Sequence, residues 1–113
     1  MKTSTINIKV STDLNHLPEK ITWEASDSGM DGEFESKSMM LALWDHGQKN
    51  TLKIDLWTKD MTVDEMKLFF YQTMMSMSAT LERATNETEA AKAMRDFCEV
   101  FAKKMDITNR EGA

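Results

Sequence analysis

The chain has 113 residues, the usual size of one domain with one hydrophobic core. Its 14 basic and 19 acidic side chains give a net charge of -5 and are mixed along the whole length, which argues against a nucleic-acid-binding surface. We find no run of about twenty apolar residues and no secretory signal, so we expect no membrane insertion. The single cysteine excludes an intramolecular disulfide and favours a reducing, cytoplasmic location.

Alternating apolar and polar residues predict strands in the first half of the chain. The four expected strands cover residues 4–12, 20–26, 37–45 and 50–58. A period of two is typical of half-buried antiparallel strands, and turn-forming residues between the first two indicate that these two pair. The third, which contains SMMLALW, is apolar on both faces, so we expect a central strand covered on both sides.

An acidic, glycine-containing loop follows the second expected strand. Its Asp27, Asp31 and Glu33 could supply oxygen ligands to calcium or magnesium. An EF-hand register that begins at Asp27 fails, because Gly29 and Ser38 stand where ligands are required. A solvated loop is the better interpretation, and the three carboxylates are weak candidates for a metal site.

The second half of the chain predicts two helices. Thr62 and Glu65 have the spacing of a capping box, which favours a first helix over 63–85. One apolar stripe comprises Val63, Met66, Phe70, Thr73, Met77, Leu81 and Ala84, and Leu68, Phe69, Tyr71, Met74 and Met75 widen it beyond one face. A helix this apolar needs at least two packing partners.

The second expected helix covers 87–105, with Asn86 as its N-cap. Its core stripe is Ala90, Met94, Phe97, Cys98, Phe101 and Met105. Cys98 on such a stripe is expected to be a small buried hydrophobe rather than a reactive thiolate. We expect residues 106–113 to form a frayed tail.

Four strands followed by two helices predict an α+β fold. We expect a single domain over residues 1–113, with a four-stranded antiparallel sheet and two C-terminal helices packed on one face of it.

The chain has no nucleotide-binding loop, metal-ligand motif or hydrolase signature, so we expect no enzymatic activity and no cofactor. His16 and His46 lie in expected turns and are interpreted as surface residues.

The apolar residues exceed what two helices are expected to cover, and eleven of them are methionines. An uncovered apolar patch usually marks a partner surface or a homo-oligomer contact. The candidates for such a surface are Trp44, Trp57, Met39, Met40, Met74, Met75 and Tyr71.

Six segments together closely resemble the GldC family of gliding-motility proteins from Bacteroidetes. They are PEKITWEASDSG at 18–29, LALWD at 41–45, NTLKIDLWTKDMTVDEMKLFFYQT at 50–73, RAT at 83–85, MRDF at 94–97 and KMDI at 104–107. The resemblance implies a small cytoplasmic accessory protein of gliding motility, whose proteins work alongside the type IX secretion apparatus. It implies no enzymatic activity and supplies no catalytic residues.

Three functions are left open by the sequence. The first is an interaction or assembly factor that presents an apolar surface to itself or to a motility protein. The second is a chaperone-like binder of extended client segments linked to type IX secretion. The third is a small enzyme or a regulator that depends on a divalent cation, with the loop from Asp27 to Glu35 acting together with Asp55 or Asp60.

Overall fold

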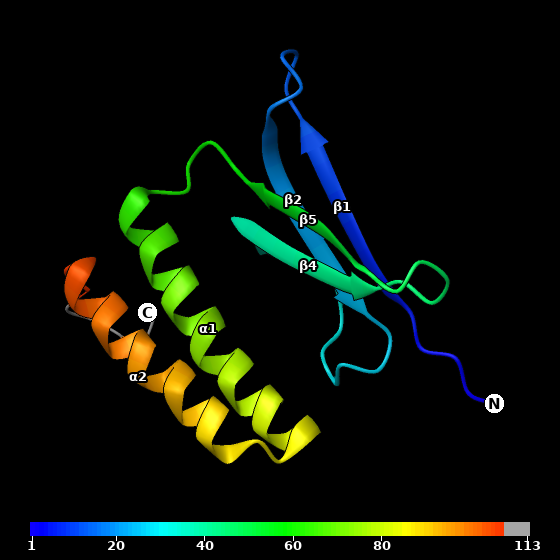
Figure 1. Cartoon of the computed structure of the whole chain (residues 1–113). Coiled ribbons are helices and arrows are strands. Elements are labelled where there is room, and N and C mark those ends of the chain that lie inside the picture. The colour runs from blue at the N-terminus through cyan, green and yellow to red at the C-terminus, as the bar shows by residue number, and fades with distance from the viewer. Residues whose placement is uncertain (108–113) are drawn as a thin grey trace. The chain divides into compact units, whose positions relative to one another are not determined.

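The computed structural model describes residues 1–107 (Figure 1). The chain divides into two compact units between Met61 and Thr62. Five strands form the first unit and two helices the second, which confirms the α+β class. The single domain and the packing of the helices on a sheet stay predictions, and residues 108–113 of the expected tail lie outside the described residues.

The first unit contains a three-stranded antiparallel sheet in the order β1-β2-β3. Its strands are β1 (Ile6–Thr12), β2 (Pro18–Ala25) and β3 (Phe34–Ser36). The predicted pairing of the first two strands is confirmed, with Ile8 opposite Trp23 and Val10 opposite Ile21. Ile21 is 1% exposed, and the rings of Trp23 and Phe34 lie 5.3 Å apart. These side chains occupy one face of the sheet, because residues two apart on a strand point the same way.

A second, two-stranded antiparallel sheet pairs β4 (Ser38–Trp44) with β5 (Thr51–Trp57). The predicted single four-stranded sheet is therefore wrong, since five strands form sheets of three and two. Lys37 separates β3, which pairs with β2, from β4, which pairs with β5. The Lys37 carbonyl accepts a hydrogen bond of 2.7 Å from the Thr58 N–H. The expectation of a central strand over 37–45 is also wrong, because β4 pairs with β5 alone in its sheet.

The second unit is a pair of helices, α1 (Val63–Thr85) and α2 (Thr88–Lys104). The predicted capping box is confirmed: the Glu65 N–H donates to Thr62 Oγ1 at 3.0 Å, and the Thr62 N–H donates to Glu65 Oε1 at 2.9 Å. The predicted role of Asn86 is wrong. Asn86 ends α1 in a left-handed conformation (φ 59), which asparagine tolerates, and Glu87 is the N-cap of α2.

The core of the helical unit is built from one large residue and several small ones. Tyr71 is 7% exposed and packs with Cys98 and Ala102. Ser78 of α1 and Ala91 of α2 are also buried. Small side chains allow two helices to pack closely. The ring of Tyr71 packs against the small residues of α2 and fills the space beside them.

The predicted core stripes differ from the observed one. Val63, Phe70 and Met77 are exposed by 73%, 43% and 52%, and Phe97 of α2 by 55%. The physical reason is that the middle of α1, from Met66 to Met77, carries apolar side chains on every side, so periodicity alone does not choose the face that meets α2.

Candidate interaction surface

One face of the β4–β5 sheet carries aliphatic side chains alone. Across the two strands Met39 pairs with Leu56, Leu41 with Ile54, and Leu43 with Leu52. These six residues are called the strand surface. Leu43, Leu52 and Ile54 are exposed by 53%, 51% and 50%. Because the six side chains share one face and half of them are well exposed, they form a contiguous apolar patch of the kind that binds proteins.

The two tryptophans lie on the opposite, mixed face of the same sheet. Trp44 pairs with Thr51 near the turn, and Trp57 pairs with Ser38 at the other end. The structure therefore does not bring the two indoles together. Trp57 lines a hollow of about 340 Å³ beside Pro18. The adjacent residues Met39 and Met40 point to opposite faces, so the sequence prediction of one joint patch applies to Met39 alone.

The three candidates on α1 serve the packing of the helical unit. Tyr71 is buried and its hydroxyl donates to Glu99 Oε1 at 3.3 Å. Met74 and Met75 are half-buried and pack against the core of Tyr71, Cys98 and Ala102.

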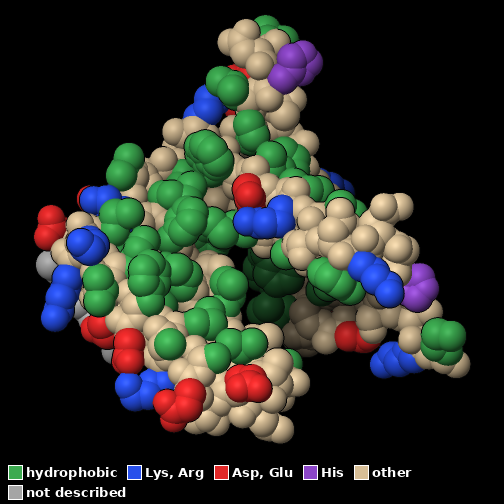
Figure 2. All heavy atoms as spheres, in the orientation of Figure 1, with side chains coloured by type: hydrophobic (Ala, Val, Ile, Leu, Met, Phe, Trp, Pro, Cys, Tyr) green, Lys and Arg blue, Asp and Glu red, His purple; other side chains and the backbone are tan. Residues whose placement is uncertain are grey.

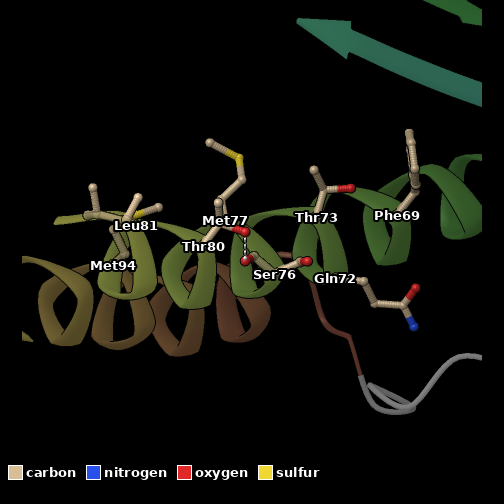
Figure 3. A pocket seen from close by; sticks show the side chains of 9 residues that line it. Phe69, Gln72, Thr73, Ser76, Met77, Thr80, Leu81 and Met94 are labelled. Carbon is tan, nitrogen blue, oxygen red and sulfur yellow. Dashed lines mark hydrogen bonds between the residues drawn. The ribbon is translucent and has the colours of Figure 1, made fainter. Parts of the chain in front are cut away.

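A groove of about 690 Å³ runs along α1 (Figure 3). Its lining residues, called the helix groove, are Phe69, Gln72, Thr73, Ser76, Met77, Thr80, Leu81, Ala84 and Met94. None of the nine carries a charge. On a helix of 3.6 residues per turn, the middle of this stripe lies nearly opposite Tyr71 and Ser78, the residues that α1 buries.

Hydrophobic side chains gather on the face of the helical unit seen in Figure 2, with charged side chains mainly around its margin. Sequence reasoning assigned several of the helix-groove residues to the core. The signal that could have distinguished them is composition, because glutamine, threonine and serine place four polar side chains on this stripe.

The acidic loop is tied to β1 and its N-terminal flank by lysines. Glu33 Oε2 lies 2.8 Å from Lys9 Nζ, and Asp27 Oδ1 lies 3.7 Å from Lys2 Nζ. The hydrogen bond with Lys9 lowers the pKa of Glu33. Asp31 is exposed and lines a shallow hollow of about 270 Å³. Among residues 1–107 no three potential ligands of the His, Cys, Asp or Glu type lie close enough to hold a metal ion.

Aspartate side chains stabilise the turns that contain the two histidines. His16 and His46 are exposed in turns, as the sequence predicts. The Asp45 carboxylate accepts hydrogen bonds from the Gly47 N–H at 3.1 Å and the Gln48 N–H at 2.6 Å, so it fixes the turn rather than the imidazole. Cys98 is 0% exposed, and burial raises the pKa of its thiol, which fits the expected role of a small core residue.

An ion-pair cluster holds the first hairpin to the end of β5. Lys59 Nζ lies 2.7 Å from Asp13 Oδ2 and 3.1 Å from Glu19 Oε1. The Asp13 side chain is 16% exposed and also accepts hydrogen bonds from the Asn15 and Leu17 N–H groups. The hydrogen bond from Lys59, followed by that from Leu17, lowers the pKa of Asp13 to about 2.

Replacing Asp13 with asparagine tests this cluster. The folded-state pKa of about 2 lies below the ordinary value of 3.8, so the ionised carboxylate stabilises the fold above about pH 4 and loses that effect as the pH falls to about 2. We expect Asp13→Asn to unfold at lower urea concentration than the wild type at pH 7, and the difference to shrink between pH 4 and pH 2. The exposed substitution Asp31→Asn is the matched control. If the wild type and Asp13→Asn differ in unfolding urea concentration as much at pH 2 as at pH 7, the charge of Asp13 is not the cause.

Neither helix in the described part of the chain has the length and continuous hydrophobicity that crossing a bilayer requires. No curated protein matches the chain. No solved structure matches it either. Residues 18–107 match the family model described as "Gliding motility-associated protein GldC-like". That match covers β2 to β5 and both helices, and it includes the strand surface and the helix groove. The chain therefore belongs to the GldC-like family of gliding motility-associated proteins.

Proposed function

We propose that the protein is a non-enzymatic accessory protein of bacterial gliding motility, and that it acts in the cytoplasm by binding a protein of the motility machinery through the strand surface. Membership of the GldC-like family supports the link to motility. The observation that carries the binding role is the strand surface itself, on which three paired rows of aliphatic residues include three side chains about half exposed. No charged residue belongs to that face, which favours an apolar protein segment over a nucleic acid as its ligand.

A chaperone-like role is the second candidate. The β4–β5 sheet has two strands, so among the described residues each strand has one edge without a neighbouring strand in its sheet. An extended client could add to such an edge through backbone hydrogen bonds and place alternate side chains on the strand surface. The structure offers no comparable observation for a cation-dependent regulator, because lysines pair with Asp27 and Glu33.

Photo-cross-linking in gliding cells distinguishes these roles. A photoreactive amino acid at Ile54 lies on the strand surface, whereas one at the neighbouring Lys53 points to the other face. We expect one abundant adduct, with a motility protein, from position 54 and little from position 53. Many different adducts from position 54 would favour the chaperone-like role. Equal yields from both positions, or none from position 54, would contradict binding through the strand surface.

A further inference from the structure

One aspartate of the chain stands directly before a glycine, in the pair Asp31-Gly32 of the loop between β2 and β3, and no asparagine does so. An aspartate side chain can close on the backbone nitrogen of the next residue. This reaction is fastest before glycine, which has no Cβ to obstruct the approach. The fold decides whether such a pair reacts, because the side chain and the peptide bond must both be able to rotate.

The contacts of the loop leave the two reacting groups free. Asp31 is exposed, and within residues 1–107 its carboxylate takes part in no hydrogen bond or ion pair. The Gly32 N–H donates to no backbone carbonyl in the same part of the chain. No bond of either group therefore has to break before the carboxyl carbon and the nitrogen can meet.

The backbone at Gly32 gives the reaction room. Gly32 has a positive φ of 95°, a conformation that glycine adopts at low cost. Beyond its chain neighbours, no heavy atom lies within 4 Å of the position that a Cβ would take. Asp31 and Gly32 also line the shallow hollow of about 270 Å³, so solvent water has access to both residues.

Asp27 lies in the same loop and shows the opposite situation. Its Oδ1 lies 3.7 Å from Lys2 Nζ, and its Oδ2 accepts a hydrogen bond from the Ser4 hydroxyl. The nitrogen that Asp27 would have to reach, that of Ser28, donates to the Ala25 carbonyl at 3.4 Å. The fold therefore holds both reacting groups at Asp27 and neither at Asp31.

We infer that Asp31 is a site of spontaneous isoaspartate formation. The Gly32 nitrogen attacks the carbon of the protonated Asp31 carboxyl group and forms a C–N bond. The nitrogen's proton and the carboxyl hydroxyl leave as water, which closes a succinimide ring. Water then adds to one of the two ring carbonyls and opens the ring. Addition at the side-chain carbonyl restores aspartate, and addition at the main-chain carbonyl of Asp31 gives isoaspartate, whose backbone runs through the former side-chain methylene.

The loop can accommodate the extra backbone atom because hydrogen bonds hold it at both ends. The Ser26 N–H donates to the Thr5 carbonyl at 2.9 Å, and Glu33 Oε2 accepts a hydrogen bond of 2.8 Å from Lys9 Nζ. Both contacts lie outside the pair Asp31-Gly32. Isomerised chains should therefore stay folded, with the wild-type urea midpoint followed by tryptophan fluorescence. The inference concerns one loop of the sheet unit and does not depend on the proposed function.

Incubation of the folded full-length protein in water enriched in oxygen-18 tests the inference, because each opening of the ring adds one oxygen atom from water. Trypsin digestion in ordinary water then releases residues 21–37 as one peptide, which contains both Asp27 and Asp31. We expect fragment ions to place heavy oxygen at residue 31, increasing with time, and several times less at residue 27. A protease that cleaves before aspartate but not before isoaspartate should progressively lose the cut at residue 31 and keep the cut at residue 27.

Two controls separate the effect of the fold from that of the sequence. Asp31→Glu keeps the charge, but glutamate would have to close a larger and slower ring, so residue 31 of this variant should take up almost no label. The free peptide 21–37 gives the rates without the fold. We expect Asp31 to react at a similar rate in the peptide and in the protein, and Asp27 to react more slowly in the protein than in the peptide. Equal labelling of Asp27 and Asp31 in the folded protein, or no labelling of Asp31, would overturn the inference.

Discussion

Tyr71→Ala is expected to lower the free energy of unfolding of the helical unit by roughly 3–5 kcal/mol, the cost of removing a large buried aromatic side chain and leaving a cavity. Tyr71 is 7% exposed and packs against Cys98 and Ala102, two small residues that cannot close over the gap. Urea unfolding followed by circular dichroism at the helical band measures the loss, because both helices lie in this unit.

Two substitutions make this test specific. Phe70→Ala removes an aromatic side chain at the next position of the same helix, where it is 43% exposed, and we expect a clearly smaller loss. Tyr71→Phe keeps the ring and removes the hydroxyl that donates to Glu99, at a cost of about 1 kcal/mol. Equal losses for Phe70→Ala and Tyr71→Ala would contradict the assignment of the core face of α1.

Ile21→Ala is expected to destabilise the sheet unit by about 2–5 kcal/mol, because Ile21 is 1% exposed and its removal leaves a cavity. The matched control is Ile6→Ala. Ile6 lies on the same face of the three-stranded sheet but is 71% exposed, so we expect a change of about 0.5 kcal/mol or less.

Tryptophan fluorescence follows this unit specifically, because all three tryptophans of the chain lie within residues 1–61. The urea midpoints of the two isoleucine variants should therefore separate clearly. If both variants unfold like the wild type, Ile21 is not the central core residue of the sheet unit.

Most of the helices and strands could be predicted, because their formation depends on residues that are close in the sequence. The alternation of apolar and polar residues predicted the strands observed as β1, β2, β4 and β5. The capping box predicted that α1 begins at Val63, as observed. The three residues of β3 were missed, since a segment that short is defined by its pairing with β2 rather than by its own pattern. The pairing partner changes from β2 to β5 at Lys37, and this change divides the strands into two sheets. It depends on residues distant in the sequence, such as Thr58, which donates to the Lys37 carbonyl.

The candidate surfaces were harder to predict than the elements. Trp44 and Trp57 were expected to reinforce one patch, but register places them at opposite ends of one face. Tyr71 was assigned to the surface because it lies off the main apolar stripe of α1. The structure shows instead that its side of α1 packs against α2 and is buried. Apolar side chains lie on every side of the middle of α1, so their spacing alone does not show which side is buried, and the helix groove was found only in the structure.

Gliding of cells whose only copy of the protein carries Ile54→Lys is the most direct test of the proposed function. The substitution puts a charge in the middle of the strand surface, where desolvation of the ammonium group would prevent an apolar partner from binding. The matched strain carries Asp55→Lys, the same new side chain one residue along β5 and on the opposite face. With equal protein levels in both strains, we predict that Ile54→Lys cells lose gliding and Asp55→Lys cells keep it. Normal gliding of Ile54→Lys cells would contradict a motility role carried by the strand surface.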